Sequence, residues 1–129
     1  MIALLLLLLA VSGSDDATIT LTNQPVYGGQ AEYHVHLDHA YHGAKFSTFC
    51  YQFQEDRYFR VWQSERFLTN DREQDVADGP LMAPSPIGYL EQRSWDATLP
   101  ANCGAVIFRD TNGKGPIPLS ESISFTVTS

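Results

Sequence analysis

The histidines are the residues whose type and spacing most directly suggest chemistry in this chain. All four fall within nine residues, at His34, His36, His39 and His42. Because residues two apart on a β-strand point to the same face, His34 and His36 could hold one metal ion together, with His39 as a third ligand. A small secreted zinc or copper enzyme that uses these histidines is therefore one interpretation of the sequence.

A solvated or partner-facing strand is the alternative interpretation of the same segment. Tyr33, Val35 and Leu37 alternate with the histidines and take the inward positions, which leaves the imidazoles on the solvent face. That face lacks the shielding that catalytic metal sites need. Protonation of the histidines at about pH 6 would instead make an interface at this strand sensitive to pH.

The two cysteines, Cys50 and Cys103, each lie within an apolar segment that is typical of a strand. The even count, the long separation and an expected export from the cytoplasm favour a disulfide bond between them. Two buried free thiols are the alternative, because export is itself an inference. The sequence contains no C-x-x-C pattern and no third sulfur ligand that would indicate a redox or zinc site.

Other catalytic patterns do not occur in the sequence. It has no G-x-S-x-G, no H-E-x-x-H and no glycine-rich phosphate loop. The carboxylate pairs lie in expected loops, away from any apolar pocket that would raise a pKa. We therefore expect a protein that is not an enzyme and that needs no cofactor.

Two acidic segments resemble calcium loops only in part. Residues 110–115 begin with a D-x-N pattern, but Lys114 stands where another acidic ligand is needed, and a hairpin turn at 112–113 explains the segment more simply. The segment 64–86 carries five acidic residues, two arginines and three closely spaced prolines. We interpret it as a long, solvated surface loop.

The chain begins with an unbroken apolar run of eleven residues. The run consists of Met1, Ile2, Ala3, Leu4, Leu5, Leu6, Leu7, Leu8, Leu9, Ala10 and Val11. As a helix it would span about 16 Å, roughly half of a bilayer core, so we expect no transmembrane anchor. Its length fits a secretory signal peptide, and Ala10 and Ser12 are spaced as in a cleavage site. The alternative is a retained segment that docks onto a neighbouring subunit during assembly.

Length and composition indicate one folded domain after this run. The chain has 129 residues, of which 43% are hydrophobic and 12% aromatic, so a core is available and disorder is excluded. We assign residues 1–16 to the apolar N-terminal segment and residues 17–129 to the domain. The net charge of −7 and the lack of any basic block make nucleic acid and anionic membranes poor partners.

Period-two alternation in short runs, separated by turn residues, predicts an all-β domain with antiparallel sheets. The expected strands are 17–23, 30–38, 45–54, 58–63, 87–95, 102–109 and 123–128. The run 102–109 is almost continuously apolar, which is typical of a central strand buried on both faces. Seven short strands at regular spacing are typical of a β-sandwich.

Residues 17–128 resemble the short immunoglobulin-like domains of bacterial secreted or surface proteins and of tailed-phage virion proteins. The resemblance is carried by ITLT, a glycine turn and AEYHVHL near the start, by FCYQ around Cys50, by Trp95 ahead of PANC at Cys103, and by the closing LSESISFTV. It implies an immunoglobulin-like antiparallel β-sandwich with Greek-key connections.

This chain departs from the antibody-type pattern at its cysteines. Counting strands places Cys50 on the third strand and Cys103 on the sixth, which are neighbours in one sheet of such a domain. The expected disulfide would therefore join two strands of the same sheet, whereas in antibody domains it joins the two sheets. Ala101 also stands where those domains place the tyrosine of the tyrosine corner.

The function expected from these features is binding or adhesion outside the cell, or on a virion, with no enzymatic step. The partner would be another protein, copies of the same chain, or a surface glycan, for which Tyr58, Trp62, Tyr89 and Trp95 could supply an aromatic face. A structural subunit of a filament or virion, assembled through a retained N-terminal segment, is the main alternative. The metalloenzyme described above is the third.

Overall fold

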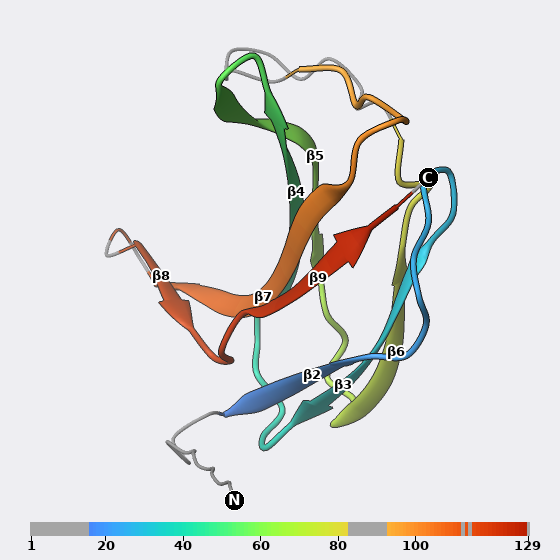
Figure 1. Cartoon of the computed structure of the whole chain (residues 1–129). Helices are drawn as coiled ribbons and strands as arrows, with labels where there is room; N and C mark the ends of the chain where they lie inside the picture. The colour runs from blue at the N-terminus through green and yellow to red at the C-terminus, as the bar shows by residue number, and fades with distance from the viewer. Residues whose placement is uncertain (1–15, 83–92, 112, 114, 129) are drawn as a thin grey trace, which may run out of the picture.

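A computed structural model describes residues 16–82, 93–111, 113 and 115–128 of this chain. The apolar N-terminal segment lies outside the described residues. The described residues form two antiparallel sheets and no helix (Figure 1). The eight described strands are β2 (Ala17–Leu21), β3 (Ala31–Leu37), β4 (Ala44–Gln54), β5 (Arg57–Phe67), β6 (Glu73–Asp78), β7 (Ala101–Thr111), β8 (Gly115–Pro118) and β9 (Ile123–Val127). The all-β prediction is thus confirmed, although seven strands were expected.

The first sheet has three strands, in the order β2-β3-β6. Its central strand, β3, buries Tyr33, Val35 and Leu37 and turns the residues between them outward, as the alternation predicts. Val35 lies opposite Ile19 on β2 and opposite Gln74 on β6. β3 therefore has one face in the core and the other open to solvent.

The second sheet has five strands, in which β4 lies between β5 and β7. The far side of β7 pairs with β9 along its first half and with β8 along its second half. Cys50 on β4 lies directly opposite Cys103 on β7, and the two form a disulfide with their Cα atoms 4.0 Å apart. The expectation of a cross-strand disulfide within one sheet is confirmed.

The two sheets face one another across a single hydrophobic core (Figure 1). At its centre the ring of Tyr33 from the first sheet lies 4.9 Å from the ring of Phe46 and 6.0 Å from that of Phe125, both from the second sheet. Contacts of this tilted or edge-on kind add to the stabilisation that comes from burying the rings. The core thus joins the sheets through side chains that only the fold brings together.

The segment 64–86 is not a single loop. β5 continues to Phe67, and after a short connection β6 forms at Glu73–Asp78 and pairs with β3. Its acidic residues indicate solvation in the sequence, but two of them, Glu73 and Asp75, alternate on the outer face of the edge strand β6, while Val76 and Asp78 point inward. An edge strand can carry many charges because one of its faces and one of its edges remain in water.

Two other strand predictions differ from the structure. Of the expected strand 87–95, residues 87–92 lie outside the described residues and residues 93–95 are not in a strand. β7 is central in its sheet but not buried on both faces, because Asn102 is exposed and Val106 and Phe108 are only partly buried on the outer side. Among the described residues, no helix is long and apolar enough to cross a lipid bilayer.

Candidate functional site

Two surfaces of the described residues concentrate groups that could act on a ligand. The first is the solvent face of β3 and β6, where His34 lies opposite Asp75 and His36 lies opposite Glu73. His34 Nδ1 is 2.9 Å from an Asp75 carboxylate oxygen, and His34 Nε2 is 2.8 Å from Glu73 Oε1. The other oxygen of Glu73 contacts His36 Nδ1. Glu73 therefore bridges the two imidazoles.

The electrostatics of this histidine-carboxylate cluster favour charged imidazoles. A neutral ring has one donor nitrogen, whereas both ring nitrogens of His34 face carboxylates, so only the imidazolium form donates to both. Hydrogen bonds to Asp75 and then to Glu73 raise the pKa of His34, and the bond to Glu73 raises the pKa of His36. The same bonds to His36 and His34 lower the pKa of Glu73.

The predicted metal ligands are only partly brought together. His34 and His36 share a face as expected, but His39 lies in the following loop, with its ring 5.6 Å from that of Tyr41. Among residues 16–82, 93–111, 113 and 115–128, no group of three or more His, Cys, Asp or Glu side chains could hold a metal ion. The arrangement at His34 and His36 is that of ion pairs, and metal binding there stays a prediction from the sequence.

The second surface is the outer face of the five-stranded sheet, which is the face turned away from the core. Alternate residues of β4 place Phe49, Tyr51 and Phe53 there, and Tyr58 of β5 lies opposite Phe53 with the two rings 5.2 Å apart. Tyr51, Phe53 and Tyr58 are all exposed. Phe67, at the far end of the same face, is 68% exposed. Aromatic side chains are rarely left in water in such numbers without a partner.

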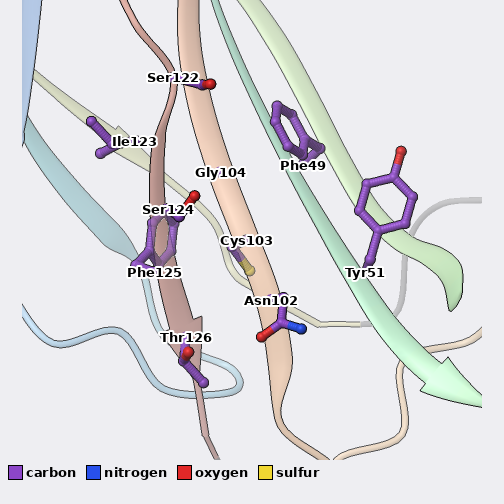
Figure 2. Close-up of a pocket in the computed structure, with 10 residues that line it drawn as sticks. All are labelled: Phe49, Tyr51, Asn102, Cys103, Gly104, Ser122, Ile123, Ser124, Phe125 and Thr126. Carbon is purple, nitrogen blue, oxygen red and sulfur yellow. The ribbon is translucent and has the colours of Figure 1, made fainter.

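A hollow of about 500 Å³ lies on this outer face, over the first residues of β7 (Figure 2). Its lining residues come from β4, β7 and β9 and from the residue just before β9. They are Phe49, Tyr51, Asn102, Cys103, Gly104, Ser122, Ile123, Ser124, Phe125 and Thr126. The volume falls within the range of about 300–1,000 Å³ that is typical of small-ligand sites.

Gly104 is one of the lining residues of this hollow and lies beneath the ring of Phe49. A Cβ at that position would come within 2.8 Å of two ring carbons of Phe49 and within 3.0 Å of the Ile123 carbonyl oxygen. The missing side chain therefore allows the Phe49 ring to lie against β7, beside the Tyr51 ring at 6.1 Å. Figure 2 shows both rings on one side of Gly104 and the hydroxyls of β9 on the other.

Most residues of this hollow are not among the site residues predicted from the sequence. Of the aromatic residues expected to form a sugar-binding face, Trp62 and Trp95 are buried in the core, and Tyr89 lies outside the described residues. Only Tyr58 is on the outer face. The F-x-Y-x-F pattern at Phe49, Tyr51 and Phe53 was the available signal, because period-two alternation alone places these three rings together.

The segment that begins at Asp110 forms a hairpin. β8 pairs with the end of β7, and Asp110 accepts a hydrogen bond from Lys45 Nζ at 2.8 Å. Glu121 stands at the twelfth position counted from Asp110, where calcium loops require a glutamate. This position can be found by counting along the sequence. Residues 115–118 are nevertheless a strand, and the Asp110 carboxylate is engaged by a cation.

Comparison with known proteins gives no relative that would assign either surface. No family model, curated protein or solved structure matches this chain. Function is therefore inferred from the geometry of these surfaces alone.

Proposed function

We propose that this chain is a non-enzymatic binding module with an immunoglobulin-like fold, which engages its partner through the outer face of the five-stranded sheet. The observation that carries the proposal is the row of aromatic side chains beside the hollow over Gly104. Among the described residues, neither a helix nor another sheet covers this outer face. Its side chains are therefore already in place to contact a ligand.

The order of the strands supports the immunoglobulin-like part of the proposal. If β2, β3 and β6 are taken as strands A, B and E, the other sheet follows as C′, C, F and G through β5, β4, β7 and β9. Immunoglobulin-like domains divide these strands between their two sheets in the same way. Under this correspondence β8 is an extra strand in the F–G connection.

The disulfide supports action outside the cytoplasm. Cys50 and Cys103 form a disulfide, and such bonds persist in oxidising compartments. Together with the apolar run at the N-terminus, it favours a secreted or surface-displayed protein. The acidic net charge agrees with a partner other than nucleic acid.

Binding of the full chain to arrays of immobilised saccharides and peptides tests the proposal. We expect a bound class whose signal falls at least about tenfold in the Tyr51→Glu variant, which adds a charge to the outer face. The control is Asn70→Glu, which adds the same charge in the exposed connection between β5 and β6. Binding that is equal in both variants, or no binding at all, would contradict the proposal.

Assembly as a filament or virion subunit is the second candidate, and the position of β2 favours it. Within the described residues β2 pairs only with β3, so its other edge is open, and it follows directly after the apolar segment. An open edge can accept a strand from another copy. Light scattering and intact mass test this candidate, because it requires a large assembly and a retained Met1.

A further inference from the structure

The hollow over Gly104 combines ring faces, free hydroxyls and an amide in a lining without charge. We infer that it is a binding site for a neutral saccharide, an inference that rests on the proposed binding function and names its ligand class. It uses Phe49 and Tyr51 as the apolar wall, and Asn102, Ser124 and Thr126 as hydrogen-bonding groups.

The shape of the hollow suits a ligand with one apolar face and polar edges. Gly104 leaves room for the Phe49 ring to lie against β7, and the rings of Phe49 and Tyr51 meet at an interplanar angle of 70°. A pyranose ring presents C–H groups on a face and hydroxyls around its rim. The C–H groups pack against the negative face of an aromatic ring, while the hydroxyls reach the polar side chains around it.

The hydrogen-bonding groups around the hollow are available to a ligand. Within the described part of the chain, no hydrogen bond engages the side chains of Asn102, Ser124 or Thr126, and all three are exposed. An amide supplies two donors and an acceptor, and each hydroxyl supplies a donor and an acceptor. Such a set matches the alternating donors and acceptors of a polyol.

The backbone of β7 under the hollow is not available, which argues against an extended peptide that would add a strand to β7. β7 lies between β4 and β9, and Asn102 and Gly104 are paired on both sides. A peptide that adds a strand needs an open edge with unpaired N–H and C=O groups. A ligand over this first part of β7 therefore meets side chains and not unpaired backbone groups of that strand.

The charge of the site favours a neutral saccharide over an acidic one. None of the ten lining side chains carries a charge, and the whole chain has a net charge of −7. A uronate or sialylated ligand would meet no cation in the hollow and would be repelled by the field of the protein. An uncharged glycan needs no cation in the hollow and is not repelled by the negative field of the protein.

Titration of the full chain with neutral oligosaccharides of glucose, mannose, xylose and N-acetylglucosamine tests the inference, with oligogalacturonate as the acidic comparison. We expect calorimetry to detect binding of at least one neutral series, and tighter binding of it than of oligogalacturonate. Tyr51→Ala should weaken that binding about tenfold, because it removes one stacking ring. Thr126→Val, which keeps the side-chain shape, should weaken it by a smaller factor.

Phe67→Ala is the matched control, because Phe67 is an exposed ring on the same face but outside the hollow. It should bind saccharide as the unmodified chain does. Absence of binding to every neutral series, preference for oligogalacturonate, or equal affinity of Tyr51→Ala and Phe67→Ala would overturn the inference. If peptides on the array bind in a Tyr51-dependent manner while saccharides do not, the inference fails and the proposed function stands.

Discussion

At the scale of single residues, Glu73 decides the chemistry of the histidine-bearing face. Its two carboxylate oxygens contact His34 and His36, which stand two residues apart on the neighbouring strand. Asp75 and Asp38 are the other charged groups that face these imidazoles, while β2 presents Thr18 and Thr20 opposite them. The cluster is therefore an exposed network of ion pairs whose strength depends on pH.

This network should make folding stability depend on pH in a predictable direction. The pKa of each imidazole is raised in the folded state, so its contribution is fully present below about pH 6.5 and is lost as the pH rises through the raised value. The pKa of Glu73 is lowered, so its contribution is lost only in more acidic solution, as the pH falls through that lowered value. We expect the free energy of unfolding to fall from pH 5.5 to pH 8.5.

Urea unfolding of the variant His34→Gln/His36→Gln measures this effect. The variant should lose a large part of the decrease between the two pH values, because neither glutamine titrates. His42→Gln is the control, since His42 is exposed in the loop after β3 and outside the cluster. A double variant with the same pH dependence as the unmodified chain would refute the role of the cluster.

At the scale of elements, the pairing of β4 with β7 organises the second sheet. Cys50 and Cys103 form a covalent bond near one end of this pairing, between residues separated by 53 positions. The closed loop contains β5 and β6, so the bond restricts much of the unfolded chain. A cross-link of this span reduces the entropy of the unfolded state by an amount equivalent to about 4 kcal/mol.

Removing the bond should therefore destabilise the fold. We expect Cys50→Ala/Cys103→Ala to lower the free energy of unfolding by about 2–4 kcal/mol, measured by urea denaturation. Reduction of the unmodified chain should give a similar loss. A titration that finds two free thiols in the native, non-reduced protein would contradict the bond itself.

The turn between β4 and β5 offers a stabilising change. Glu55 and Asp56 both have positive φ, at 51° and 75°, although neither is glycine. Two-residue hairpin turns of this kind favour glycine in such positions, because a Cβ is strained there. We expect Asp56→Gly to raise the free energy of unfolding by about 1 kcal/mol, measured as a higher melting temperature. Asp56→Ala should give no such gain. Equal gains from both variants would contradict the strain argument.

At the scale of the whole molecule, one buried carboxylate links the two sheets. Asp78 of β6 is 1% exposed and accepts a hydrogen bond from Thr48 of β4 at 2.5 Å. It also forms an ion pair at 2.8 Å with Arg66 of β5. The sheets are thus joined by a polar contact at one side of the core as well as by the hydrophobic contacts at its centre.

Replacing Asp78 should cost far more stability than replacing an exposed aspartate. We expect Asp78→Ala to lower the free energy of unfolding by about 3 kcal/mol, because Arg66 loses its ion-pair partner and the buried Thr48 hydroxyl loses its acceptor. Asp71→Ala, in the exposed connection before β6, should change it by less than about 1 kcal/mol. Similar urea midpoints for the two variants would show that Asp78 does not link the sheets.

Local alternation made much of the fold predictable from the sequence. β2, β3 and β9 lie within expected ranges, and β4 and β7 extend theirs by one or two residues at an end, because the side-chain alternation of a strand can be read from consecutive residues. β6 was not predicted because its acidic residues are typical of a surface loop. An edge strand can also carry such residues, because one of its edges stays in water. The expected strand β5 was cut short at residue 63 for the same reason, since its last part carries alternating charges.

The sequence by itself determined the all-β class, the inward residues of β3 and the pairing of the only two cysteines. Only the tertiary structure decided which strands are neighbours, and this gave the histidines their carboxylate partners on β6 and placed Gly104 between Phe49 and the hydroxyls of β9. The physical reason is that strand pairing joins residues far apart in the chain, whereas alternation is a property of adjacent ones. Both candidate surfaces arise from that long-range pairing.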